Sequence, residues 1–157
     1  DDTIQHAGVV VGLGGVAAHV LCKLPRDAEG YMGRLRCVQE ISAVTAACMM
    51  VKTSVFKAVG GFDEELKVAF NDIDLCMKVR KYGVKIVFTP YAELYHYESK
   101  SRGMEDTPEK QLRFSREVNC FRRKWERELL KGDPYYNPNL TLNNTDCSLR
   151  KQEKNGD

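Results

Sequence analysis

The clearest pattern along the chain is an apolar stripe near its C-terminal end. Between Pro108 and Lys131, apolar residues recur at intervals of three or four, and arginine and lysine fill much of the sequence between them. The stripe consists of Phe114, Val118, Phe121, Trp125 and Leu129. Because this spacing returns to one face of an α-helix, we predict one long amphipathic helix from Pro108 to about Lys131.

Two further helices are predicted upstream. A short one runs from the potential caps Thr53 and Ser54 to Val59, and the glycine pair at 60–61 ends it. A second begins at about Asn71, with apolar residues on one face and lysine and arginine in its last turn. Glycine follows that turn, as is usual at a helix C-terminus.

Four segments have the character of strands. Residues 6–11 are rich in valine, residues 84–88 alternate, and residues 92–97 follow a proline-containing turn. The strongest candidate is 38–50, whose second half is an apolar run typical of a strand buried on both faces. The connection 22–37 contains proline, glycine and charges, which predicts irregular structure. Together the pattern indicates an α/β fold.

Composition narrows the class of protein. The 157 residues suffice for one domain with a core, and a net charge of +2 gives no reason to expect nucleic acid. No apolar run approaches the roughly 20 residues of a membrane span, and the first residues do not resemble a signal peptide. The six cysteines form no C-x-x-C pair, and Cys48 and Cys76 lie in apolar patterns. We therefore expect buried free thiols in a reducing cytoplasm, and no zinc site.

The acidic pair Asp72 and Asp74 at the start of the second helix is the main candidate for chemistry. Acidic side chains in a first turn stabilise the helix by about 0.3–1 kcal/mol each, which is the simpler reading and the favoured one for Asp74. Asp72, presented where the helix starts, can alternatively project into a cleft and accept a proton from an alcohol. The small residues Ala46 and Ala47 leave room for a ligand beside the preceding segment.

Several motifs follow one another in a fixed order along the chain. They are Gly60-Gly61-Phe62-Asp63-Glu64, Asn71-Asp72-Ile73-Asp74-Leu75-Cys76, Gly83, Tyr91-Ala92-Glu93-Leu94-Tyr95-His96 with Ser99, and Asp133-Pro134-Tyr135-Tyr136-Asn137-Pro138-Asn139-Leu140. This order resembles the C-terminal half of family 2 glycosyltransferases, which have the GT-A fold and build bacterial surface polysaccharides. The similarity spans roughly residues 5–142, and the ending at 133–140 is similar to that of O-antigen and rhamnose-type members.

This resemblance implies roles for residues at matching positions. Asp72 would be the catalytic base of an inverting displacement. Asn71 stands where the family usually has glutamate, and an amide still hydrogen-bonds a hydroxyl. Thr45 and Ala46, with Ala47, stand where members often have Thr-Gly-Ala lining the sugar pocket, so this chain adds a methyl group there.

His96 and Arg102 are candidates for the donor side of the reaction. His96 resembles a histidine that completes the Mg²⁺ or Mn²⁺ shell or contacts the donor diphosphate, although a locally hydrogen-bonded histidine is an equal alternative. Arg102 could offset charge on the diphosphate, although a solvated loop arginine is the simpler reading.

The resemblance also implies how the chain is divided into structural parts. We expect residues 1–106 to be the acceptor-side, catalytic-base portion of a GT-A mixed sheet flanked by helices. Residues 107–140 would form the long helix and an extended segment, and 141–157 a disordered tail. GT-A enzymes bind the nucleotide and metal in an N-terminal half that we do not recognise here, so we expect a fragment that is inactive alone.

The expected substrates are a nucleoside-diphosphate sugar and a saccharide or lipid-linked acceptor. We expect a cytoplasmic location, where the arginine-rich helix would allow contact with the inner face of an anionic membrane, and an uncovered face would allow a homodimer. The alternative function is a non-catalytic carbohydrate-binding module, which would hold glycans without nucleotide or metal.

Overall fold

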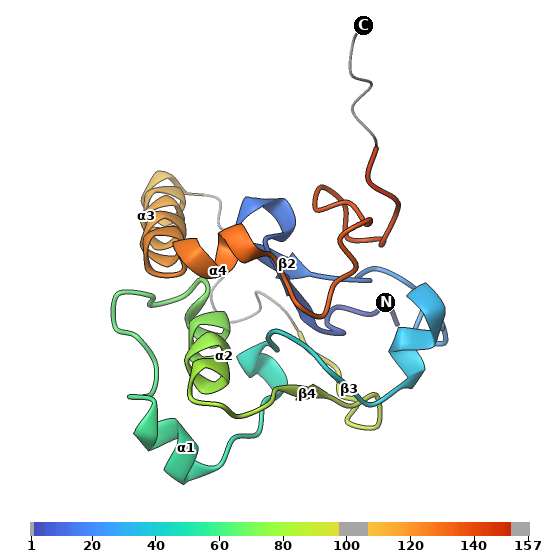
Figure 1. The fold of residues 1–157 in the computed structure, drawn as a ribbon, viewed down its shortest axis with the longest axis horizontal. Coiled ribbons are helices and arrows are strands. Elements are labelled where there is room, and N and C mark those ends of the chain that lie inside the picture. Colours follow the sequence, from blue (N-terminus) through green and yellow to red (C-terminus); the bar gives the residue numbers. More distant parts are fainter. Residues whose placement is uncertain (1, 98–106, 152–157) are drawn as a thin grey trace, which may run out of the picture.

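The computed structural model describes residues 2–97 and 107–151 and shows a mixed α/β fold, in which small sheets are accompanied by helices (Figure 1). In the described part of the chain the strands pair as two antiparallel, two-stranded sheets, β1 with β2 and β3 with β4. The strands are β1 (Val9–Val11), β2 (Ala17–His19), β3 (Gln39–Glu40) and β4 (Val87–Phe88), and the α-helices are α1 (Thr53–Ala58), α2 (Asn71–Lys81), α3 (Pro108–Lys124) and α4 (Glu126–Lys131). Short 3-10 helices span Leu13–Gly15, Tyr31–Arg36 and Ala46–Cys48.

The first sheet is a hairpin whose first strand, β1, lies inside the predicted segment 6–11 and whose second strand, β2, follows that segment. Val9 pairs with His19 and Val11 with Ala17. The turn between the strands requires positive φ angles at Gly12 (97°) and Gly14 (65°), which glycine adopts without strain. The structure thus places a second strand, β2, where we predicted none.

The prediction of a doubly buried strand over 38–50 is wrong. Gln39–Glu40 forms a two-residue ladder with β4, and the buried Ala43 then makes a single isolated bridge with Val9 of β1. Ala46–Cys48 is an exposed 3-10 turn because the Thr45 hydroxyl accepts the amide of Ala47 at 3.4 Å and caps the turn. A side-chain hydrogen bond of this kind competes with strand pairing.

The two later strand predictions have different outcomes. Segment 84–88 contains a strand, but it is limited to β4, Val87–Phe88. Residues 92–97 form no strand and are exposed, so that prediction is wrong. The apolar content of 92–97 therefore does not reflect burial within the described part of the chain.

Helix α2 confirms the prediction of a helix beginning at Asn71. The residue before it, Phe70, has a left-handed φ of 64°, and its ring packs on Phe114 and Phe121 at centroid distances of 5.8 and 5.3 Å. These aromatic contacts explain how a bulky residue is held in a conformation that normally favours glycine. At the other end the chain turns at Gly83, where φ is 91°.

Helix α1 matches the predicted extent closely but not the predicted cap. Lys52 occupies the N-cap position and makes no side-chain hydrogen bond to the helix. The glycine pair at 60–61 ends the segment with φ angles of 80° and 63°, as predicted.

The single long helix predicted over 108–131 is instead two helices, α3 and α4, that break at Trp125. Trp125 has φ −113° and ψ 22°, outside helical values. Phe121 and Trp125 from the predicted stripe are buried, whereas Phe114 is half exposed. The break therefore lies where the stripe enters the core. This core packs β1 against α2 and the α3–α4 junction, through Val9, Val11, Ile73, Met77, Phe121 and Trp125.

Residues 141–151, for which we predicted disorder, are held by hydrogen bonds in the structure. The Thr141 amide donates to the Ser148 carbonyl, and the Arg150 amide to the Asn139 carbonyl, both at 2.8 Å. The buried Cys147 lies within this turn, and residues 152–157 lie outside the described part.

Two other sequence-based expectations can be compared with the structure. Cys76 is a buried free thiol as expected, but Cys48 is exposed, because it lies in the 3-10 turn rather than in a strand. Within residues 2–97 and 107–151, no helix has both the length and the apolar character needed to cross a membrane.

Candidate functional site

The carboxylate of Asp72 lies in the first turn of α2, where it meets the segment that precedes α1. Its Oδ1 accepts the amide of Ile73 at 2.8 Å, and its Oδ2 accepts the amide of Ala46 at 3.0 Å. Ala46 is exposed and Asp72 is partly buried. The structure thus brings together two of the predicted site residues that are 26 positions apart in the sequence.

The neighbouring segment is attached to α2 at a second point. The Val44 amide approaches the Cys76 Sγ at 3.5 Å, and this thiol donates to the Val44 carbonyl at 3.7 Å. Burial raises the pKa of Cys76 to about 11, so the thiol stays protonated and available as a donor. Thr45 and Ala46 follow directly, so their backbone is fixed along the first half of the helix.

A carboxylate held in this way keeps capacity for a substrate. Its two oxygens offer about four acceptor positions, and the hydrogen bonds to Ile73 and Ala46 use two of them. Asn71, the first residue of α2, is also partly exposed and adjoins Asp72 in the chain. The arrangement can therefore orient a hydroxyl group and accept its proton.

His6 makes another contact with this segment, and sequence reasoning did not assign it to the site. Its Nε2 accepts the Thr45 amide at 3.4 Å, and its Nδ1 lies 3.0 Å from the Nδ1 of His19 in β2. Burial, followed by the nearby His19, lowers the pKa of His6 to about 3. A lone histidine before a valine strand carries no sequence signal for this contact.

This lowered pKa predicts a loss of stability in mild acid. Unfolding returns His6 to an ordinary pKa of 6.5, so between pH 6.5 and about 3 the unfolded state binds a proton that the folded state does not. As the pH is lowered through that window, the free energy of unfolding should then fall by roughly 1.4 kcal/mol per pH unit. Above pH 6.5, His6 should make no contribution to the pH dependence. Urea unfolding at pH 7 and pH 5 measures the slope before most carboxylates titrate. The variant His6→Gln should flatten it, and an unchanged slope would contradict the assignment.

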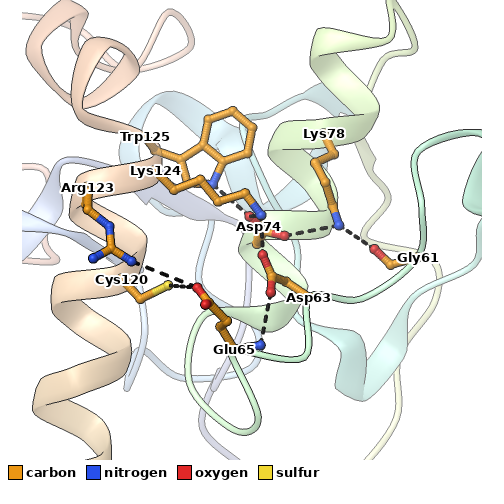
Figure 2. A network of polar contacts seen from close by, with 9 residues as sticks. All are labelled: Gly61, Asp63, Glu65, Asp74, Lys78, Cys120, Arg123, Lys124 and Trp125. Carbon is orange, nitrogen blue, oxygen red and sulfur yellow. Dashed lines mark hydrogen bonds and ion pairs between the residues drawn. The ribbon is translucent and has the colours of Figure 1, made fainter.

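Asp74 takes a different role from the helix capping favoured by its position. Its side chain is fully buried, and its Oδ1 accepts both the Trp125 indole Nε1 and the Lys124 Nζ at 2.8 Å. The Lys78 Nζ lies 3.2 Å from its Oδ2, one helical turn away. Figure 2 shows the carboxylate between the two lysines and the indole. Asp74 therefore joins α2 to the α3–α4 junction.

Further polar contacts extend this network to the loop before α2. Lys124 also bonds to Asp63, and Lys78 bonds to the Gly61 carbonyl (Figure 2). Lys124 and then the Glu65 amide hold the pKa of Asp63 below its usual range. Thus the glycine turn noted in the sequence is tied to the helix that carries Asp72, and the polar network fixes that helix rather than supplying reacting groups.

Of the two predicted donor-side residues, His96 lies within the part of the chain that the structure describes. His96 is exposed, and its Nδ1 lies 2.7 Å from the Gln5 Oε1. Arg102 lies outside the described residues. Among the residues that are described, no group of three or more histidine, cysteine, aspartate or glutamate side chains could hold a metal ion. The side chains in view therefore do not make up the expected metal site by themselves.

Comparison with known proteins finds relatives for the whole chain and for part of it. The chain is 57% identical over 150 residues to an uncharacterized protein of Sinorhizobium fredii, covering 95% of this chain and 16% of that protein. It is 38% identical over 158 residues to the O-antigen biosynthesis protein RfbC of Myxococcus xanthus, covering 100% of this chain and 12% of that protein. It is also 36% identical over 62 residues to an N-acetylglucosaminyl-diphospho-decaprenol L-rhamnosyltransferase of Mycobacterium tuberculosis, covering 40% of this chain and 20% of that protein.

No protein-family model matches the chain. No solved structure matches it either. The chain spans about one sixth or less of the two curated relatives that it matches over nearly its whole length. The names of the characterised relatives agree with the resemblance found in the motifs, and they support a relationship between this chain and rhamnosyltransferase-type glycosyltransferases.

Proposed function

We propose that this chain is the acceptor-side part of an inverting, family 2 glycosyltransferase of the GT-A fold that works in polysaccharide biosynthesis. Asp72 would deprotonate a hydroxyl of a saccharide or lipid-linked acceptor. The freed oxygen would attack the anomeric carbon of a nucleoside-diphosphate sugar, and the bond to the diphosphate would break. The observation that carries the proposal is the meeting of Asp72 with Ala46, at 3.0 Å, in a chain related to proteins of O-antigen and rhamnosyl transfer.

The residues around Asp72 would divide the remaining work. Asn71 would hydrogen-bond the acceptor, and Thr45 and Ala46 would line the sugar pocket. The small side chain of exposed Ala46 leaves the approach to Asp72 open. These roles require that one hydroxyl group is bound and oriented. The backbone of residues 44–46 favours this because it is fixed to α2 at two points.

A divalent metal, when bound, would stabilise the departing diphosphate. The described side chains do not fit such an ion alone, because His96 offers one exposed imidazole with no carboxylate partner among its described contacts. We therefore propose that the donor and metal are held mainly by residues outside this chain, and we derive no step through the metal.

One observation favours the alternative of a non-catalytic carbohydrate-binding module. Both oxygens of Asp72 already accept backbone amides, as they would in a purely structural role. A module of this kind would bind glycans at the same surface and would transfer no sugar.

Thermal unfolding of this chain with added ligands tests whether the chain contains a complete donor site. Neither of the two proposed functions requires one. We expect no metal-dependent stabilisation by UDP-, GDP- or dTDP-sugars, because the donor site would be incomplete. Binding to the folded state raises stability by RT ln(1 + [L]/Kd), so a ligand at 100 times its Kd adds about 2.7 kcal/mol. A clear shift with one nucleotide sugar and Mn²⁺ would contradict our placement of the donor site.

Free oligosaccharides form the other arm of this experiment. Stabilisation by a glycan is expected under both functions, and it should be lost under both when Ala46 is enlarged to leucine, because both place the glycan beside Asp72. Thr53→Ala, at the start of α1, is a matched surface control. Glycan binding together with failure of the longer glycosyltransferase to release an inverted product would favour the module.

A further inference from the structure

The strongest additional feature of the molecule is a chain of hydrogen bonds that ends at Asp72 and begins at a histidine pair. The Nδ1 atoms of His19 and His6 lie 3.0 Å apart. The Thr45 amide approaches the other nitrogen of His6 at 3.4 Å, and the next amide, that of Ala46, donates to Asp72. Four segments far apart in the sequence therefore meet in one line of contacts.

The donors and acceptors in this line fix the protonation of both rings. A backbone amide only donates, so the Nε2 of His6 must be unprotonated to accept it. A neutral His6 then carries its proton on Nδ1 and donates it to His19. The Nδ1 of His19 must accept, so a neutral His19 carries its proton on Nε2.

The opposite arrangements each lose a hydrogen bond. A proton on the Nε2 of His6 would face the Thr45 amide, donor against donor. A fully protonated His6 would meet the same conflict, and a positively charged His19 would oppose it further. Burial of the His6 ring also keeps it neutral, in agreement with its lowered pKa.

We infer that His6, as its neutral Nδ1-protonated form, is a positioning residue that holds the Thr45–Ala46 backbone against Asp72. The His6 ring, which precedes β1 in the chain, accepts one amide of this segment, and Asp72 of α2 accepts the next amide. His19 in turn fixes the orientation of the His6 ring, which is a common role for the second nitrogen of a functional histidine. The catalytic consequence of this inference rests on the proposed function, whereas its structural part does not.

Two substitutions separate the two contacts of His6. Glutamine can carry its amide oxygen close to the place of Nε2, so His6→Gln should keep the acceptor for Thr45. Asparagine is shorter and places its amide near Nδ1, so His6→Asn should keep the contact with His19 and lose the one with Thr45. The two variants are similar in polarity, so their difference reports the Thr45 contact.

The first test is nitrogen-15 NMR of the full 157-residue chain with labelled histidine at pH 7. We expect His6 to be protonated on Nδ1 and His19 on Nε2. A His6 ring protonated on Nε2, or one that is charged, would overturn the inference without any variant.

The second test is amide hydrogen exchange of Ala46 relative to Val9. The Val9 amide bonds to Ala43 at 2.9 Å and reports the stability of the nearby core. In His6→Asn, the ratio of the Ala46 rate to the Val9 rate should rise by about tenfold or more, while in His6→Gln it should stay within about threefold of the original. An unchanged ratio in His6→Asn, or an equal rise in both variants, would overturn the inference.

A third measurement links the position of Ala46 to catalysis. In the longer glycosyltransferase, His6→Asn should lower kcat with little change in KM, and His6→Gln should restore most of the loss. Equal kcat values in the two variants would remove the catalytic consequence. Failure of the proposed function is recognised separately, by normal turnover in Asp72→Asn, whereas the NMR results concern His6 alone.

Discussion

Replacing Asp74 by alanine is expected to lower the free energy of unfolding by about 3–5 kcal/mol, the cost typical of breaking a buried ion pair by removing one partner. Asp74 has no exposed side-chain surface, while the side chains of Lys78 and Lys124 are 18% and 32% exposed. Without the carboxylate, two partly buried ammonium groups lose their counter-charge, and the indole of Trp125 loses its acceptor.

Urea unfolding with a matched series isolates this effect. The midpoint should fall while the slope m stays constant, since the exposed area on unfolding changes little. Asp74→Asn should lose less stability than Asp74→Ala, because an amide oxygen can still accept the Trp125 indole proton. Asp63→Asn is the control, because Asp63 also binds Lys124 but is 22% exposed. We expect it to cost about 1 kcal/mol. Equal losses for Asp63→Asn and Asp74→Ala would contradict the central role of Asp74.

The structure of α2 could be predicted from sequence because its signals are local. Apolar residues recur with helical spacing, acidic residues open the first turn, and Gly83 follows the last. Each of these signals acts within a few residues, so the helix and the position of Asp72 on it follow from the sequence. The motif resemblance then pointed to the same residue.

The long-range contacts of the site could not be predicted in the same way. Asp74 and Lys78 are four residues apart, a spacing visible in the sequence, but Asp74 and Trp125 are 51 residues apart and meet only through packing. No residue close to His6 in the sequence indicates its contact with Thr45. The strand prediction for 38–50 was wrong because small apolar residues suit a strand and a short turn equally well. In the structure the hydroxyl of Thr45 accepts the Ala47 amide, which favours the turn.

Replacing Asp72 by asparagine is expected to reduce sugar transfer by about 10²–10⁴-fold or more in the glycosyltransferase to which this segment would belong. Asparagine has nearly the same shape but no basic oxygen to accept the acceptor proton. Its single amide oxygen can keep one of the two hydrogen bonds, to Ile73 or to Ala46, and it loses the other. The stability should therefore fall by only about 1 kcal/mol, the typical net value of one hydrogen bond.

The comparison of turnover with stability distinguishes a base from a structural aspartate. If Asp72 only holds Ala46, then Asp72→Asn and His6→Asn should lower kcat by similar factors, because each loosens the same segment. If Asp72 is the base, Asp72→Asn should be far more damaging than His6→Asn at equal thermal stability. Normal turnover in Asp72→Asn would refute the general-base role. A loss that His6→Asn matches would instead leave Asp72 as a residue that shapes the site without taking the proton.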